Sequence, residues 1–267
     1  MATQTGGISM TLETVNLRTE GNVGIISLNR PKAMNALNKQ IFVDLFKAFE
    51  AVENDDTIRC VILNGEGRAF CAGGDIPEMK NMTEEKEIFD FYAIAGDCLK
   101  KMINLPKPVI AAAHGAIAGA GTSILLASDI PLVSDDSVFI VAFGKVGLIP
   151  DSADHYLLPR AVGLNMAKEL MMTQRPVKAD EMLRLRIANH VYPADQLMDE
   201  AMKLAKQIAA GPLNCYASSK SILNTAFETD LDTSLKEETR LQAAARMNPN
   251  GEEGLTAFLE KRNPEFK

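Results

Sequence analysis

Two glycine-rich segments have the clearest chemical potential in this chain of 267 residues. The first, residues 65–75, is GEGRAFCAGGD, and the second, residues 114–122, is HGAIAGAGT; each follows a short apolar run. Glycines let backbone N–H groups approach a ligand oxygen closely, and a helix N-terminus adds a favourable partial charge. Two such amides directed at one carbonyl would form an oxyanion hole, in which each donor is worth about 3–4 kcal/mol.

Glycine spacing alone also fits two ordinary tight turns between strand and helix, and this plainer interpretation is the more common one. Neither segment matches a nucleotide-binding pattern. Gly119-Ala-Gly121 is followed three residues later by Ile124 rather than glycine, and no Gly-Lys-Ser/Thr run occurs. The sequence therefore gives little support to a nucleotide cofactor.

The elements that must position these segments alternate between strands and helices. Short apolar runs at 23–28, 60–63 and 109–113 predict buried strands, and helical spacing from about Lys39 and over Ile88–Met102 predicts amphipathic helices. This alternation predicts parallel strands with helical crossovers, so both glycine-rich segments should meet at one edge of the sheet.

The sequence beyond Asp151 is predominantly helical in pattern. Helices are predicted at 153–160, 165–172, 179–185, 194–210, 213–227, 231–245 and 251–258. We expect an α/β core at 11–195 and a C-terminal helical region at 196–267. Because that region is too thin to bury its own apolar faces, it should pack on a neighbouring subunit.

Composition and charge narrow the function classes. The formal net charge of −7, from 28 Lys+Arg and 35 Asp+Glu, argues against nucleic acid as the main partner. Four cysteines without a C-x-x-C pair, and three histidines, predict neither a metal site nor a disulfide framework. Met1–Ser9 lacks the features of a signal peptide, and the apolar stretch Val109–Val133 is broken by glycines and polar residues. We expect a cytoplasmic protein that does not enter membranes.

Several motifs resemble those of the crotonase (enoyl-CoA hydratase/isomerase) superfamily, in its order and spacing, from about residue 11 to the C-terminus. They are LNRPKAMNAL at 28–37, AFCAGGDI at 69–76, KPVIAAAHG at 107–115, AGAG at 118–121, SD at 128–129 and AFLEKR at 257–262. The resemblance implies a crotonase-like ββα spiral core, with a C-terminal helical trimerisation region. It also implies a homotrimer or a dimer of trimers.

The resemblance further implies a site for an acyl-CoA thioester, with coenzyme A as part of the substrate and no separate cofactor. The backbone N–H groups of Gly74 and Ala120 match the oxyanion-hole positions; many relatives have glycine at the second, and a backbone donor survives that change. The positions that match coenzyme A contacts are Lys32, Ala33, Ala72, Asp75, Ile76, Phe258 and Lys261.

The acid–base residues distinguish reactions within this superfamily. The two glutamates of its hydratases correspond here to Ser123 and Gly147, neither of which can shuttle a proton as a carboxylate does. Asp151 instead matches the catalytic carboxylate of the Δ3,Δ2-enoyl-CoA isomerases and of the ring-opening isomerases of phenylacetyl-CoA degradation. One carboxylate suffices for a 1,3-proton shift through a dienolate held in the oxyanion hole.

For this role, the pKa of Asp151 must rise above the usual value of about 3.9, which requires a water-poor pocket. We expect Phe143, Leu148 and Ile149 to supply its walls. The residue also precedes a predicted helix, so it is well placed to be an N-cap, and the two roles are compatible. The far wall of the pocket should come from 79–93 and from the helical tail.

The neighbouring polar residues receive plainer interpretations. Asp154 is expected to be a first-turn charge favoured by the helix dipole. His155 is the alternative base, although no carboxylate in sequence orients it. Cys71 is expected to be a small buried apolar residue rather than a nucleophile, and His114 to be structural.

The sequence thus predicts an enoyl-CoA isomerase with Asp151 as the shuttling base. Alternatives are an enoyl-CoA hydratase, or a ring-epoxide isomerase or hydrolase acting on another acyl-CoA. A non-catalytic acyl-CoA-binding subunit is a further alternative from a different functional class.

Overall fold

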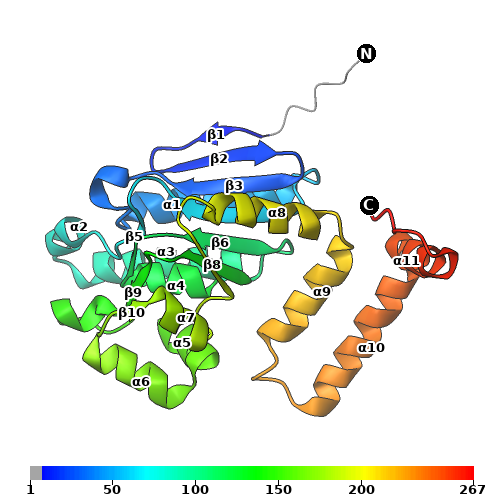
Figure 1. The fold of residues 1–267 in the computed structure, drawn as a ribbon. Coiled ribbons are helices and arrows are strands. Elements are labelled where there is room, and N and C mark those ends of the chain that lie inside the picture. The colour runs from blue at the N-terminus through cyan, green and yellow to red at the C-terminus, as the bar shows by residue number, and fades with distance from the viewer. Residues whose placement is uncertain (1–7) are drawn as a thin grey trace.

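A computed structural model describes residues 8–267 (Figure 1). The stretch Met1–Ser9, on which the signal-peptide prediction rests, lies outside the described residues except for its last two. Within the described chain, the larger sheet has the order β1 (Met10–Thr11), β2 (Val15–Glu20), β3 (Val23–Leu28), β4 (Cys60–Gly65), β6 (Val109–Ala113), β8 (Ile130–Ser134) and β11 (His190–Tyr192). The smaller sheet has the order β10 (Val177–Lys178), β9 (Val138–Ile140), β7 (Ala116–Ala118) and β5 (Ala69–Cys71).

The larger sheet is parallel from β3 onward and antiparallel at its β1–β3 end. The three predicted strands are β3, β4 and β6, which are direct neighbours in parallel register. The predicted α/β class and parallel crossovers are therefore confirmed. The antiparallel β1–β2 addition was not predicted, because its strands are half-exposed and show no continuous apolar run.

The glycine-rich segments are more than turns, contrary to the simplest expectation. Each contains a strand of the smaller sheet, β5 in the first and β7 in the second, and the two strands pair in parallel. Helix α4 (Ala120–Leu126) begins only after β7, rather than directly after β6. Because β4 and β6 are adjacent, the segments that follow them do meet at one end of the sheet, as predicted.

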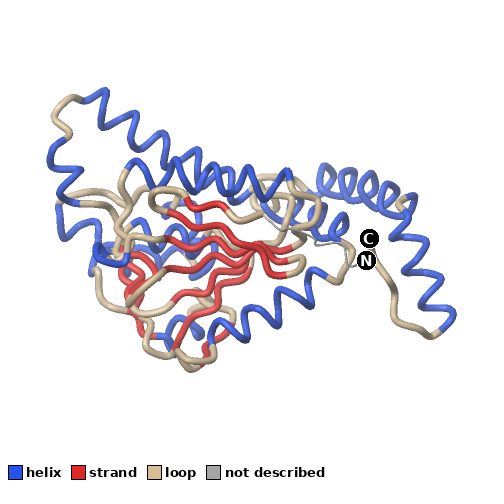
Figure 2. Tube along the Cα trace, turned by 90° about the horizontal axis from the view of Figure 1, so that it is seen from above, coloured by secondary structure: helices blue, strands red, loops and turns tan. Residues whose placement is uncertain are grey.

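Helices cover both faces of the larger sheet (Figure 2). The remaining helices are α1 (Lys39–Asn54), α2 (Ile76–Asn81), α3 (Glu85–Ile103), α5 (Asp154–Val162), α6 (Leu164–Thr173), α7 (Ala179–Arg184), α8 (Leu197–Ala209), α9 (Leu213–Asn224), α10 (Leu231–Met247) and α11 (Pro249–Glu260), with short 3-10 turns η1 (Pro31–Ala33) and η2 (Ala142–Val146). Alternate residues of a strand face opposite clusters: Leu63 packs on the side of α1 and α3, and Ile62 on the side of α8. Burial on both faces explains why these strands are continuously apolar.

Of the C-terminal helices, α10 and α11 lie apart from the core, whereas α9 is joined to it by the Lys220–Asp129 ion pair (Figure 1). Helix α8 packs its alanines Ala201 and Ala205 on the sheet, whereas α9 and α10 bury no residue in this chain. Apolar side chains of this tail are exposed, among them Phe227, Met247 and Phe258. The division at 195/196 and the trimer stay predictions, and the exposed tail is in keeping with a role in assembly. Within residues 8–267, no helix is long and apolar enough to span a bilayer.

Asn35 joins the chain before α1 to the first glycine-rich segment, so it fixes one wall of the cavity described below. Its side chain is fully buried; Oδ1 accepts from the Arg30 N–H at 2.9 Å, and Nδ2 donates to the Ala69 carbonyl at 2.8 Å and the Glu66 carbonyl at 2.9 Å. Its φ of 55° lies in the left-handed region that asparagine tolerates.

We therefore expect Asn35→Ala to lower the free energy of unfolding by about 1–3 kcal/mol, because buried amide and carbonyl groups lose their partners. Urea denaturation followed by circular dichroism measures the change. The matched control is Asn81→Ala, at an exposed residue without a side-chain hydrogen bond. Equal denaturation midpoints for both variants would contradict this role of Asn35.

Candidate active site

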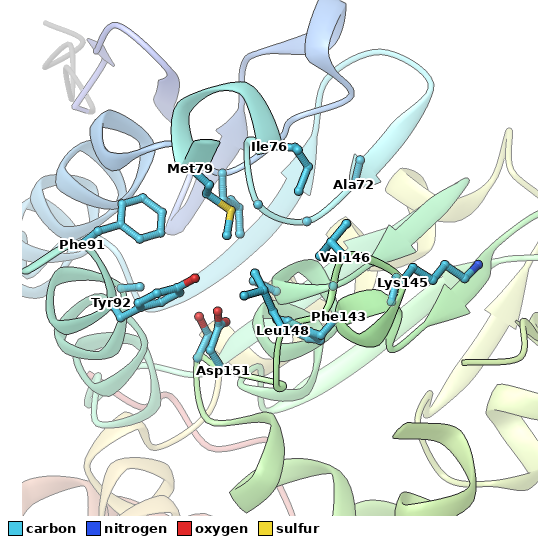
Figure 3. A pocket seen from close by; sticks show the side chains of 18 of the residues that line it. Ala72, Ile76, Met79, Phe91, Tyr92, Phe143, Lys145, Val146, Leu148 and Asp151 are labelled. Atoms are coloured by element: carbon cyan, nitrogen blue, oxygen red, sulfur yellow. The ribbon is translucent and has the colours of Figure 1, made fainter. Parts of the chain in front are cut away.

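A mostly apolar cavity of about 250 Å³ lies beside the end of the smaller sheet (Figure 3). Its lining comes from the first glycine-rich segment, the start of α4, helices α2 and α3, and the segment from η2 to α5. The lining residues are Leu37, Phe42, Ala72, Gly73, Gly74, Ile76, Met79, Phe91, Tyr92, Ala95, Gly119, Ala120, Ala142, Phe143, Lys145, Val146, Leu148, Asp151 and Ser152.

Two residues that line this cavity have a backbone N–H without an acceptor in the described chain. Gly74 and Ala120 both line it, and no atom of residues 8–267 accepts a hydrogen bond from either N–H. Ala120 is the first residue of α4, so its amide has no partner within the helix. The two predicted oxyanion-hole residues are thus brought to one cavity, each with a free donor.

Close contact between backbones holds the two donors together. Gly73 has a φ of 98°, and a Cβ built there would lie 2.9 Å from the Ala118 carbonyl oxygen. A Cβ built on Gly119, whose φ is 49°, would lie 3.4 Å from the Gly73 Cα. Only glycine allows this approach at Gly73 without displacing the backbone.

Asp151 is the carboxylate of the cavity (Figure 3). Its side chain is largely buried, and Oδ1 has no hydrogen-bond partner within the described chain. Burial raises its pKa above the usual value, and this outweighs the lowering by Ser152 and by the charge of His155. The capping interpretation is wrong, because α5 begins at Asp154 after the N-cap Ala153.

The turn after Asp151 is conformationally unusual. Ser152 and Ala153 both have left-handed backbones, with φ of 50° and 69°, although neither is glycine. The turn reverses the chain so that Asp154 points into the protein beneath α4. There the Thr122 hydroxyl lies 2.7 Å from Asp154 Oδ2, and the Ser123 hydroxyl donates to the Asp151 carbonyl at 3.2 Å.

The residues around Asp151 match the predicted wall residues only in part. Phe143 and Leu148 line the cavity as expected. Ile149 does not line it, and its side chain is 77% exposed, so this expectation was wrong. Gly147, matched from sequence to a hydratase glutamate, is also absent from the lining. Phe143, from the same stretch of chain, lines the cavity.

Tyr92 is a functional candidate that sequence reasoning did not name. It projects from α3 with its hydroxyl directed toward Asp151 (Figure 3). Burial and the charge of Asp151 raise its pKa. The only sequence indication was its place within 79–93, the segment expected to form the far wall, because a tyrosine among apolar helix positions has no distinguishing pattern.

An apolar hollow continues the cavity outward between α2 and α3. It has a volume of about 290 Å³ and adds Lys80, Met82 and Ile88 to lining that it shares with the cavity. The prediction that 79–93 forms the far wall is thereby confirmed. No residue of the helical tail lines either space within residues 8–267.

The predicted coenzyme A positions fall into two groups. Ala72 and Ile76 line the cavity, and η1, which holds Lys32 and Ala33, lies beside them because the Ala72 N–H donates to the Met34 carbonyl at 3.0 Å. The Asp75 carboxylate caps α2 and pairs with Arg30 at 2.8 Å. Neither observation tests coenzyme A binding, which stays a prediction.

The other predicted positions are Phe258, on α11, and Lys261, the C-cap residue of that helix, which lies apart from the cavity (Figure 1). Phe258 is 81% exposed, and neither residue lines the cavity in this chain. The structure therefore does not unite the two groups within one chain.

The remaining polar candidates, Asp154, His155 and His114, differ in how far their side chains are buried. Asp154 occupies the first turn of α5, as predicted, but it is fully buried, and its pKa is raised to about 7, mainly by burial. It is therefore no ordinary surface charge. His155 is exposed and lies outside the cavity lining, and His114 Nε2 is hydrogen-bonded to the Gly67 carbonyl oxygen at 2.8 Å. Residues 8–267 hold no cluster of three or more metal-ligating side chains.

Comparison with known proteins gives a consistent result. The family model described as enoyl-CoA hydratase/isomerase matches residues 18–267. The chain is 34% identical to a 1,2-epoxyphenylacetyl-CoA isomerase of Escherichia coli over 96% of its own length and 98% of the relative's. It is 35% identical to a short-chain-enoyl-CoA hydratase of Clostridium acetobutylicum, over 96% and 98%. A crystal structure of an enoyl-CoA hydratase from Polaromonas superposes with a TM-score of 0.91 at 34% identity, covering 95% and 99%.

Cys71 should be chemically inert in the folded protein. Burial raises the pKa of its thiol to about 12, and its Sγ contacts the Asn35 carbonyl at 3.3 Å. At pH 8 only about one thiol in 10⁴ is then ionised, so we expect no measurable iodoacetamide labelling of Cys71 within an hour. Peptide mass spectrometry measures labelling, with the guanidinium-unfolded protein as the control in which the thiol reacts. Rapid labelling of the native protein would restore Cys71 as a candidate nucleophile.

Proposed function

Because the chain belongs to the enoyl-CoA hydratase/isomerase family, we propose that it is an acyl-CoA enzyme that shifts a carbon–carbon double bond by 1,3-proton transfer. The observation that supports this most directly is Asp151, a largely buried carboxylate whose Oδ1 has no hydrogen-bond partner in the described chain, in the same cavity as two free backbone donors. These are the groups that a proton shift through a thioester dienolate requires, and no other cofactor is needed.

In this proposal the thioester oxygen accepts hydrogen bonds from the N–H groups of Gly74 and Ala120. Negative charge grows on that oxygen as a proton leaves the acyl chain. Donors that are already fixed in place stabilise the growing charge without reorganisation, at about 3–4 kcal/mol per donor. The partial positive charge of a helix N-terminus acts in the same direction at Ala120.

Asp151 then acts as the proton carrier. As a carboxylate it removes a proton from one end of the allylic system, the α- or the γ-carbon, and a dienolate forms. The protonated side chain returns the same proton to the other end, and the double bond has moved. Its raised pKa suits both steps, because a carboxylate of ordinary acidity is a weak base for a carbon acid.

Hydration is less well supported, because it needs a second carboxylate to manage the water. The positions matched to the hydratase glutamates hold Ser123 and Gly147, which do not line the cavity and cannot shuttle a proton in this way. Asp154 does not substitute for a second glutamate, since it is fully buried and does not line the cavity. A single exchangeable proton is sufficient for isomerisation.

Ring-epoxide isomerisation is the second candidate, favoured by the 34% identity to a relative that bears that name. The same oxyanion hole and carboxylate serve it. The apolar hollow beyond Met79 and Phe91 accommodates an aliphatic or alicyclic acyl group equally well. A purely binding role is disfavoured, because an unpaired buried carboxylate costs stability and does nothing for binding alone.

Assembly and location complete the proposal. We place the enzyme in the cytoplasm as a homotrimer or a dimer of trimers, with the exposed apolar side chains of α9–α11 at the subunit contacts. Phe258 and Lys261 would then approach the coenzyme A moiety bound by a neighbouring chain.

Asp151→Asn should abolish most isomerisation, because an amide can neither accept nor return the proton. We expect kcat on 3-enoyl-CoA to fall by about 10²–10⁴, with KM nearly unchanged. The rise in absorbance of the conjugated 2-enoyl thioester measures the rate. Asp180→Asn, at an exposed position on α7, is the matched control. Equal rates for wild type and Asp151→Asn, or no conjugated product from either, would refute the isomerase proposal.

Ala120→Pro should remove one oxyanion donor while the helix is kept. Proline is tolerated at the first helical position, where the N–H has no partner within the helix. We expect kcat to fall by about 10²–10³, with an unchanged circular dichroism spectrum. Ala120→Gly retains the N–H and should stay within about tenfold of wild type. Similar kcat values for the two variants would show that this amide does not bind the developing oxyanion.

A further inference from the structure

Asp154 is a buried acid that the proposed reaction does not use. Its side chain has no exposed surface and does not line the cavity. Oδ2 lies 2.7 Å from Thr122 Oγ1, and Oδ1 has no partner in the described chain. No cation is among the groups that affect it. An ionised carboxylate is poorly stabilised in such a place.

The hydrogen bonds of Thr122 define the protonation state of this acid. Its Oγ1 lies 2.5 Å from the Gly119 carbonyl oxygen as well as 2.7 Å from Asp154 Oδ2. A hydroxyl has one proton to donate, and a carbonyl oxygen has none. When the Thr122 proton goes to Gly119, the short contact with Asp154 is a hydrogen bond only if the proton there belongs to Asp154.

This chain of hydrogen bonds ends at the oxyanion hole. Gly119 is the N-cap of α4 and directly precedes Ala120, whose free N–H faces the cavity. Gly119 has a φ of 49°. Glycine has little conformational preference of its own, so this backbone conformation must be fixed by contacts with other residues. The Thr122 hydroxyl therefore restrains the peptide group that presents the donor.

The charge of Asp151 also acts on Asp154 and raises its pKa. The two aspartates flank a two-residue turn, and the Asp154 N–H donates to the Asp151 carbonyl at 3.0 Å. Two ionised carboxylates this close repel each other, so the state in which one of the two is protonated is favoured over the state in which both are ionised. With Asp154 neutral, Asp151 is the only carboxylate among the residues that line the cavity in the described chain.

We propose that Asp154 is a positioning residue that works in its protonated form, donating to Thr122 so that Thr122 can restrain Gly119 and the Ala120 donor. Loss of its proton releases this restraint and puts a second negative charge beside Asp151. The kinetic consequence of this inference rests on the proposed isomerase function. Its structural part, a protonated Asp154, rests on hydrogen-bond geometry alone.

The charged and titratable groups around Asp154 are few. From α4 it faces the uncharged hydroxyls of Thr122 and Ser123, and from the preceding turn it faces Asp151. His155 on α5 is exposed, and Tyr92 on α3 reaches Asp151 rather than Asp154. Burial raises the pKa of Asp154 to about 7, so the working form is lost as pH rises through that region.

The kinetic test compares kcat for 3-enoyl-CoA isomerisation across pH 5–9 in wild type and Asp154→Asn. Wild-type kcat should fall by at least about tenfold between pH 7 and pH 9, because the protonated fraction of Asp154 falls. An asparagine donates to Thr122 at every pH, so the ratio of kcat at pH 9 to kcat at pH 7 should return to near one. KM should change little, because neither side chain contacts the substrate.

Thr122→Val and Thr122→Ser form a second, matched pair. Valine removes the link between Asp154 and Gly119 and should lower kcat more than tenfold, whereas serine retains the hydroxyl and should restore at least half of the loss on a logarithmic scale. An alkaline fall that persists unchanged in Asp154→Asn, or equal kcat for the valine and serine variants, would overturn the inference.

An infrared measurement separates this inference from the proposed reaction. The Asp151→Asn protein at pH 5.5 should show a protonated carboxyl band that is missing from Asp151→Asn/Asp154→Asn, with no substrate present. Absence of the band difference overturns the inference even if isomerisation is observed. If the band is present but the wild-type protein has no isomerase activity, the protonated Asp154 is supported and the proposed reaction is refuted instead.

Discussion

The site depends on the close approach of two backbone segments, at Gly73 and at Gly119. Both segments continue strands of the smaller sheet, and the parallel pairing of β5 with β7 brings them together. A side chain at Gly73 would force them apart. Because of this approach, Gly74 and Ala120 line one cavity, and their amides have no acceptor within residues 8–267. The larger sheet, its helices and the Asn35 hydrogen bonds support this contact.

A second requirement is that the cavity holds a carboxylate and little water. The apolar rings and chains of Phe91, Phe143 and Leu148 surround Asp151, and its Oδ1 finds no donor. Such a carboxylate is a stronger base than one in water. The same low polarity strengthens hydrogen bonds from the two amides to a substrate oxygen. One environment thus serves both halves of the proposed chemistry.

Much of this arrangement could be predicted from the sequence, and the exceptions have physical causes. Strands β3, β4 and β6 were visible because burial on both faces requires continuous apolar runs. Strands β5 and β7 were not, since three residues among glycines show no periodicity. Motif resemblance located Gly74, Ala120 and Asp151, which the structure places in one cavity.

Residues whose role depends on the distant chain were harder to predict. Ile149 adjoins Leu148 in sequence, yet a turn directs it to solvent. Asp154 has the local pattern of a first-turn helix charge, and only the packing of α5 against α4 shows that it is buried. Tyr92 gains significance solely from the carboxylate on another segment. Local sequence patterns contain no information on such contacts.

The backbone between the two aspartates has a further consequence. Ser152 and Ala153 are both held in the left-handed region, at a cost of roughly 1–2 kcal/mol each. Glycines would relieve that strain, but they would also let the loop sample many more shapes. Tertiary contacts instead impose one shape on residues that resist it, so the Asp151 carboxyl group loses little conformational entropy when a ligand arrives. This loop is preorganised for ligand binding at a cost to the stability of the folded protein.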